Sequence, residues 1–144
     1  MLRFRQAVET DADMMFSWRN CKAVRLASFD SREISWKEHQ DWVRQSLERT
    51  DRSLLIAQDA EMPVGVLRFD QAGETVEVSV FLDPAMIGRG YGTAILQAGI
   101  TWARQNLAGA KVMRAQIKPN NPASSRVFEK AGFVEARLVY ELNL

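Results

Sequence analysis

The stretch Asp83-Pro-Ala-Met-Ile-Gly-Arg-Gly-Tyr-Gly-Thr-Ala-Ile-Leu96 lies where a predicted strand passes into a predicted helix. It contains three glycines, Gly88, Gly90 and Gly92, within five residues. Glycines at such a turn let the backbone approach a ligand, and the exposed amides at the positive end of a helix attract phosphate. Thr93 excludes the dinucleotide-binding pattern, which needs a glycine at that position, and no Walker loop follows Gly92. The spacing therefore favours a phosphate-binding turn over a turn that serves geometry alone.

The charge distribution is consistent with a bound anion. The net charge of the 144 residues is only +1, yet residues 86–130 contain seven cations and one anion. A local excess of this kind fits a small polyanionic ligand, although a solvated basic face explains it equally well, and it does not indicate nucleic acid. The length and a hydrophobic content of 47% predict one globular domain over residues 1–144.

The composition excludes several classes of protein. No apolar run approaches the length of about 18 residues that a membrane span needs, and residues 1–6 do not resemble a secretory signal. Cys21 is the single cysteine, so no internal disulfide can form, and together with His39 it offers too few ligands for zinc. We therefore expect a cytoplasmic protein with no metal site.

The pattern along the chain predicts alternating strands and helices. Ser35 and Glu38 form a capping box at the start of one helix, and Asn121 followed by proline caps another, which Gly132 ends. Residues 70–73 predict a hairpin turn, and residues 21–33 a loop with a helical turn. Expected strands cover residues 2–7, 53–58, 63–69, 74–82, 111–117 and 133–142. The resulting order β α α β β β α β α β predicts a mixed sheet flanked by helices.

Two motifs resemble those of the GNAT acetyltransferases. Residues 83–96 resemble the acetyl-CoA signature, Gln/Arg-x-x-Gly-x-Gly/Ala at the start of a helix, and residues 121–133 resemble the second motif, which ends in Lys-x-Gly-Phe. The resemblance implies a GNAT-type α/β fold with a mostly antiparallel mixed sheet. It also implies that acetyl-CoA is the cofactor, with CoA as the product.

Scattered residues in the first half are similar to one branch of this family. They include Trp18-Arg-Asn20, Ser28-Phe29, Glu38-His39 and Trp42. The branch contains the N-acetyltransferases that modify nucleotide-linked amino sugars in pseudaminic acid-type surface-sugar and flagellin glycosylation pathways. The alternatives are acetylation of protein N-termini, as in the ribosomal-protein type, or of small amines, and a non-catalytic acyl-CoA sensor. Relatives also imply a possible homodimer.

The resemblance implies a set of cofactor-binding residues. Six amides would bind the pyrophosphate: Gly88, Arg89, Gly90, Tyr91, Gly92 and Thr93. The strand end would pair with the pantetheine arm: Val80, Phe81 and Leu82. Asn121 and Ser124 would lie beside the arm, and Arg126 or Lys130 would bind the 3′-phosphate. Ile87 and Phe128 occupy two further cofactor-binding positions.

Two positions depart from the family pattern. Ile87 stands where the signature has glutamine or arginine, which removes one side chain but no amide. Phe128 replaces the tyrosine that commonly protonates the leaving thiolate, and phenylalanine cannot donate a proton. Ser124, Ser125, Tyr140 or water are the alternatives for this acid.

Candidates for the acceptor side come from both halves of the chain. Glu77 could act as the catalytic base through water, or it is an exposed strand glutamate. His39 is predicted to bind substrate first and to act as a base second, against the alternative of a packed histidine. Four further residues are predicted to bind the acceptor: Arg19, Asn20, Arg25 and Arg68. Ion pairing is the alternative for these arginines, and the four tryptophans are expected in the core.

Overall fold

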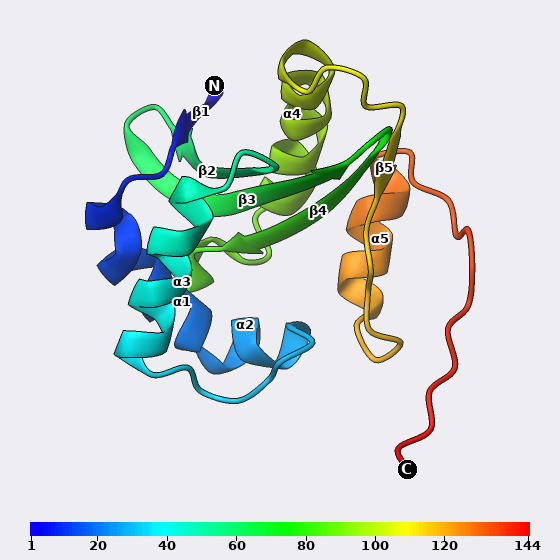
Figure 1. The fold of residues 1–144 in the computed structure, drawn as a ribbon, viewed down its shortest axis with the longest axis horizontal. Helices are drawn as coiled ribbons and strands as arrows, with labels where there is room; N and C mark the ends of the chain where they lie inside the picture. The colour runs from blue at the N-terminus through cyan, green and yellow to red at the C-terminus, as the bar shows by residue number, and fades with distance from the viewer.

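A computed structural model describes residues 1–144, in which five strands form a single mixed sheet (Figure 1). The strands follow one another in the order β1-β2-β3-β4-β5, antiparallel except for the parallel pair β4 and β5. Their bounds are β1 Leu2–Gln6, β2 Arg52–Asp59, β3 Met62–Ala72, β4 Thr75–Leu82 and β5 Val112–Arg114. The helices are α1 Ala12–Asn20, α2 Lys22–Ala27, α3 Trp36–Glu48, α4 Tyr91–Asn106 and α5 Pro122–Lys130.

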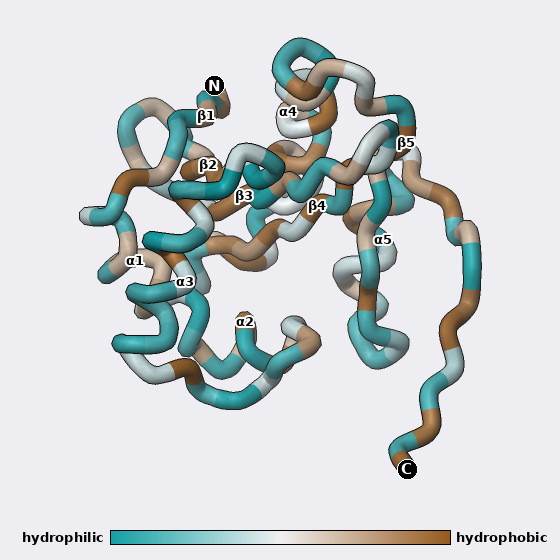
Figure 2. Tube along the Cα trace, in the orientation of Figure 1, coloured by the Kyte–Doolittle hydropathy of each residue, from teal (hydrophilic) through white to brown (hydrophobic).

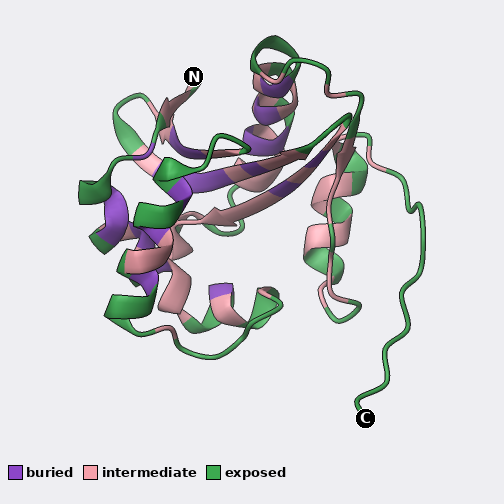
Figure 3. Ribbon diagram, in the orientation of Figure 1, coloured by how far each residue is buried: buried purple, intermediate pink, exposed green.

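Each face of the sheet has its own core. On one face α4 packs Ile95 and Leu96 against the inward side chains of β3 and β4, such as Leu67 and Val76. On the other face α1 and α3 cover a second cluster: Ala7, Ala12, Met15, Trp18, Val43, Leu54, Ile56 and Val66. Apolar segments of the trace concentrate where the helices meet the sheet (Figure 2), and the same segments are buried (Figure 3). The predicted alternation along β4 is confirmed, because Val76 and Val78 lie in the first cluster while Phe81 packs on the second.

The predicted helix ends are largely confirmed. Ser35 Oγ accepts a hydrogen bond from the backbone N–H of Glu38, at 3.2 Å. Asn121 Oδ1 accepts one from the N–H of Ser124, also at 3.2 Å, and Gly132 lies just past α5 with φ of 102°. The capping box at Ser35 is incomplete, because the Glu38 carboxylate pairs with Arg32 instead of returning to the cap.

Four predicted elements differ from the structure. The region after residue 21 forms the six-residue helix α2, and the hairpin turns at residues 73–74, so that Asp70 lies within β3. β5 has only three residues of the predicted 111–117. The strand predicted over 133–142 is wrong, since residues 134–144 are extended but form no backbone hydrogen bond. A strand exists only with a paired neighbour, and no other strand of this chain lies against them.

No helix is both long and apolar enough to cross a membrane. No group of three or more histidine, cysteine, aspartate or glutamate side chains is placed to hold a metal ion.

Candidate functional site

The glycine turn presents a row of free amides. Gly88 and Gly90 both have φ of 83°, a left-handed conformation that glycine adopts without strain, and Gly90 is the N-cap of α4. The first backbone hydrogen bond of α4 runs from Ala94 to Gly90. The N–H groups of residues 88–93 therefore have no protein acceptor. Six consecutive free amides at the positive end of a sixteen-residue helix offer hydrogen-bond donors to an anion.

The start of α4 is fixed from two sides. Tyr91 donates a hydrogen bond from its hydroxyl to Asp59 Oδ2, at 2.6 Å, which ties the helix to the end of β2. This bond raises the pKa of Tyr91 and lowers the pKa of Asp59. On the other side, a β-carbon at Gly92 would lie 3.6 Å from Val127, so α5 runs beside the first turn of α4. Contacts with β2 and with α5 thus both fix the position of these amides.

An open strand edge lies next to the turn. β4 pairs with β5 only over Thr75–Glu77, and the two strands diverge beyond that point (Figure 1). Val80, Phe81 and Leu82 pair with β3 on one side, and their other edge has no strand partner. An extended ligand that carries amide groups can pair with such an edge in the manner of an added strand.

α5 carries the remaining predicted cofactor residues. Asn121 Nδ2 donates to Ser124 Oγ at 2.8 Å, so the side chain of Asn121 is engaged in capping α5. Phe128 packs edge-on against Phe133, with ring centroids 5.1 Å apart. Ile87 and three cations are exposed: Arg89, Arg126 and Lys130.

His39 is a packed residue of α3, which covers the face of the sheet opposite to α4. It is 4% exposed, its Nε2 lies 3.0 Å from the carbonyl oxygen of Ala12, and its ring lies beside Phe16 and Trp42. Because a carbonyl can only accept, Nε2 carries the hydrogen. Burial lowers the pKa of His39 and favours its neutral form.

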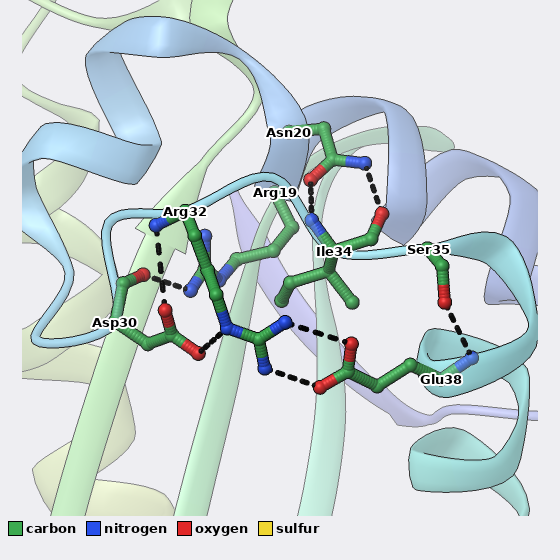
Figure 4. Close-up of polar contacts among 7 residues, drawn as sticks. All are labelled: Arg19, Asn20, Asp30, Arg32, Ile34, Ser35 and Glu38. Atoms are coloured by element: carbon green, nitrogen blue, oxygen red, sulfur yellow. Dashed lines mark hydrogen bonds and ion pairs between the residues drawn. The ribbon is translucent and has the colours of Figure 1, made fainter.

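Three predicted acceptor residues hold the loop of residues 28–34, and Figure 4 shows two of them, Arg19 and Asn20. Asn20 accepts from the N–H of Ile34 and donates to its carbonyl, both at 2.9 Å. Arg25 donates to the carbonyl oxygens of Asn20 and Ser31. Arg19 Nη2 donates to the carbonyl oxygen of Asp30, at 2.6 Å. These side chains therefore shape the loop directly.

The guanidinium of Arg19 is only partly satisfied. Its Nη1 is buried and has no hydrogen-bond partner, and burial lowers the pKa of the side chain. The charge of Asp30 opposes this shift, but its carboxylate pairs with Arg32 at 3.0 Å, and Arg32 also pairs with Glu38. Arg19 thus keeps an uncompensated donor next to the loop that it holds.

Arg68 and Glu77 lie on the sheet face that α1 and α3 cover. Arg68 Nη2 donates to Ser79 Oγ at 3.2 Å, and the guanidinium lies over the ring of Trp42. Its Nε lies 3.2 Å from Asp70 Oδ2 in an ion pair but makes no aligned hydrogen bond. Burial lowers the pKa of Arg68, while the charges of Asp70 and Glu77 oppose that shift. Glu77 stands opposite Asp70 in the β3–β4 register.

Sequence reasoning missed one contact that spans the molecule. Lys118 donates from Nζ to the carbonyl oxygens of Ser28, at 2.9 Å, and Leu26, at 3.3 Å. It thereby joins the segment before α5 to the end of α2. No local pattern marks this lysine, because its partners are backbone carbonyls about ninety residues away along the chain.

Known proteins share this architecture. The Vibrio cholerae spermidine N-acetyltransferase, solved with CoA and spermine, superposes with a TM-score of 0.86 at 18% identity, covering 99% of this chain and 87% of that one. A candidate phosphinothricin acetyltransferase of Bacillus subtilis is 30% identical over 120 residues, which cover 78% of this chain and 71% of the relative.

An uncharacterized protein of Methanocaldococcus jannaschii is 23% identical over 97% of this chain. The chain spans only 31% of that relative's length. The acetyltransferase (GNAT) domain family matches residues 1–134, nearly the whole chain. The mixed α/β architecture expected from the two motifs is confirmed. The chain therefore belongs to the GNAT family of acetyltransferases, which use acetyl-CoA as the acetyl donor.

Proposed function

We propose that the chain transfers the acetyl group of acetyl-CoA to the primary amine of a nucleotide-linked amino sugar. The observation that carries this choice of acceptor is the buried, unpaired Nη1 of Arg19. A buried charged donor without a partner is costly, and a phosphate oxygen of the acceptor is a matching partner for it. Polyamines have no acceptor oxygen, and aminoglycosides offer only neutral hydroxyl and ether oxygens, so neither supplies the charged acceptor that a phosphate does.

The charges around the loop of residues 28–34 support an anionic acceptor. Residues 19–34 contain four cations and two anions. Arg25 and Lys118 donate only to neutral backbone carbonyls, which do not cancel their charge. This excess of positive charge attracts a diphosphate and repels a polyamine.

The donor half of the reaction is assigned to the glycine turn and β4. In this proposal the amides of residues 88–93 bind the pyrophosphate of acetyl-CoA, and the open edge at Val80–Leu82 pairs with the pantetheine arm. Arg126 or Lys130, both exposed on α5, binds the 3′-phosphate. This arrangement does not need the glutamine or arginine that the family signature has at position 87, because main-chain groups bind the pyrophosphate.

Acetyl transfer also needs two proton movements. The amine must lose a proton to attack the thioester carbon, and the departing thiolate must gain one. We assign the first to Glu77 acting through water. We assign the second to Ser124, because its Oγ accepts from Asn121 Nδ2 and its own hydrogen remains free to donate. His39 is left to packing, with its Nε2 hydrogen engaged by Ala12.

The acceptor can be tested with a panel of amines. Release of free thiol from acetyl-CoA is followed with nucleotide amino sugars, spermine, an aminoglycoside and a peptide N-terminus. We expect turnover with a nucleotide amino sugar and little with the polycations. Turnover on peptides alone would exclude the proposed acceptor. Tight acetyl-CoA binding without turnover on any amine would favour a non-catalytic acyl-CoA sensor. The replacement of the usual tyrosine by Phe128 is the feature that is consistent with such a sensor.

Variants of Arg19 sharpen the test. Arg19→Gln removes the charge and should raise the KM for the nucleotide sugar about tenfold or more, since a hydrogen bond to a charged group contributes roughly 1.5–3 kcal/mol. The KM for acetyl-CoA should not change. Arg44→Gln is the matched control, because Arg44 is an exposed arginine on α3 that pairs with Glu9. An equal effect of both variants would contradict the role of Arg19.

A further inference from the structure

A row of charged residues crosses the face of the sheet that α1 and α3 cover. The strand registers align four of them, one from each strand from β2 to β5: Arg52, Asp70, Glu77 and Arg114. Val76 and Met113, which precede the last two, pack in the core on the side of α4. Because alternate side chains of a strand point to opposite faces, the charged row lies on the other face.

Two arginines hold Asp70 in this row. Arg52 Nε donates to Asp70 Oδ1 at 2.6 Å, and Arg68 Nε lies 3.2 Å from Asp70 Oδ2 in an ion pair. All three side chains are mostly buried. Two positive charges surround one negative charge, so one positive charge is left over beside the carboxylate.

Arg68 is held in place on three sides. Its Nη2 donates to Ser79 Oγ at 3.2 Å, and the centre of its guanidinium lies 5.8 Å from the ring centroid of Trp42 on α3. The ion pair with Asp70 is the third contact. A guanidinium that has a hydrogen bond, an ion pair and an aromatic ring against it has little freedom to turn away.

Glu77 lies beside this arginine without a partner of its own. Arg68 stands opposite Ser79 in the β3–β4 register, which makes it the diagonal neighbour of Glu77. Diagonal neighbours lie about 7–8 Å apart, within reach of long side chains. The charge of Glu77 counteracts the lowering of the pKa of Arg68 by burial, which is consistent with this proximity.

Two other charged groups face Glu77 from the neighbouring strands. Asp70 stands directly opposite on β3, but its carboxylate is engaged by its two arginines. Arg114 stands opposite on β5, and no hydrogen bond or ion pair fixes its side chain. From α3, the uncharged ring of Trp42 lies against the arginines. Arg68 is therefore the positive charge that the fold holds next to Glu77.

We propose that Arg68 is a positioning residue that keeps the carboxylate of Glu77 ionised, so that it can take a proton from the acceptor amine. The inference rests on the proposed role of Glu77 as the base. A base must be unprotonated to act, and a positive charge nearby favours the unprotonated form of a carboxyl group. The proton passes through water to Glu77 as the amide bond forms, and it leaves to solvent after the product is released.

Carbon-13 NMR of the glutamate carboxyl groups tests the inference without any acceptor. The signal of Glu77 is identified by its loss in Glu77→Gln. In Arg68→Gln the midpoint of its titration should move to higher pH by about 0.5–1 unit, because one nearby positive charge is lost. Arg68→Lys keeps the charge and should restore most of the wild-type midpoint. Arg104→Gln, which removes an exposed arginine of α4, is the matched control and should change nothing.

Equal midpoints in the wild type and in Arg68→Gln would overturn the proposal, as would equal shifts in the Gln and Lys variants. If Arg68→Gln does not fold, Arg68→Met takes its place, because the methionine side chain packs against Trp42 without a polar group to bury.

The pH profile of kcat separates the inference from the proposed base. It is measured with the amine of the panel that gives the highest turnover. The acid side of the profile should move to higher pH in Arg68→Gln together with the NMR midpoint, and the KM for acetyl-CoA should not change. If this acid limb disappears in Glu77→Gln but keeps its wild-type position in Arg68→Gln, the base is correct and the inference is overturned.

A wild-type acid limb in Glu77→Gln would show instead that Glu77 is not the base, and the inference would fall with it. Absence of turnover with every amine would contradict the proposed function, and the NMR midpoints would still decide for or against the effect of Arg68 on Glu77.

Discussion

His39 illustrates how the surroundings of a residue determine its chemistry. Its position on the apolar stripe of a helix is compatible with both a substrate-binding and a packing role. The structure surrounds the ring with Phe16 and Trp42 and engages Nε2 with the carbonyl of Ala12. Burial lowers its pKa below the ordinary value, and the nearby charge of Arg19 acts in the same direction. The neutral imidazole of His39 therefore contributes to the packing of the folded chain.

This shift predicts a stability that depends on pH. The unfolded chain protonates its histidine at about pH 6.5, but the folded chain does so only at lower pH. The free energy of unfolding should be at its highest above about pH 6.5. It should fall as the pH decreases from there toward the pKa of His39 in the folded chain. His39→Gln should remove most of this slope and lower the stability at pH 7 by about 1–2 kcal/mol.

Urea unfolding between pH 5.5 and 7.5 measures the effect. The chain contains a single histidine, so the wild-type slope in this range reports mainly on His39. An unchanged slope in His39→Gln would contradict a lowered pKa. Thiol-release activity of the same variant separates the roles, because a packing residue changes stability, whereas a base changes the pH profile of kcat.

Long-range contacts of single residues are beyond the reach of sequence patterns. The sequence predicts that Arg19 and Asn20 bind the acceptor, yet both also hold backbone groups of the loop at residues 28–34. Arginine and asparagine at a helix end suit both roles, since their donors match carbonyls as well as ligands. Only the position of the loop in the folded chain distinguishes the structural role from the binding role.

At the scale of elements, local chemistry predicts most of the fold. The Asn121 cap, the Ser35 cap and the alternation along β4 depend on residues within a few positions of one another, and the structure confirms them. The strand over residues 133–142 fails for the opposite reason. Its pattern is that of a strand, but strand formation depends on a partner that no local pattern can supply.

The glycine turn allows a prediction with a matched control. Gly90 has φ of 83° and Gly73 in the β3–β4 hairpin has φ of 62°, and at both positions a β-carbon would meet only open space. Alanine at either position should cost about 1–2 kcal/mol of stability, because the left-handed conformation is strained for residues with a β-carbon. Only Gly90→Ala should also weaken acetyl-CoA binding, by crowding the amides of residues 88–93.

Calorimetric titration with acetyl-CoA, together with thermal unfolding, compares the two variants. Equal losses of stability with a loss of affinity in Gly90→Ala alone support a main-chain site for the pyrophosphate. If both variants bind acetyl-CoA as tightly as the wild type, the turn does not hold the cofactor and the anion site must lie elsewhere.

At the scale of the whole molecule, the two halves of the proposed site come from distant parts of the chain. The donor side consists of the end of β4, the glycine turn and the start of α5, whereas the acceptor side consists of α1, α2 and the loop at residues 28–34. Lys118 joins them, because it precedes α5 and binds the carbonyls of Leu26 and Ser28. Its ammonium also complements the negative end of α2.

Removal of this link should loosen the acceptor side without affecting the donor side. Lys118→Met keeps much of the aliphatic chain but loses both hydrogen bonds. We expect a raised KM for the acceptor, an unchanged KM for acetyl-CoA and faster hydrogen exchange over residues 22–34. The loss of stability should stay below about 1 kcal/mol, as is usual for a partly exposed charge. Lys37→Met, which removes an exposed lysine paired with Asp41 on α3, should leave all these quantities unchanged. If Lys118→Met raises the KM of both substrates equally, the lysine supports the fold as a whole and does not position the acceptor loop.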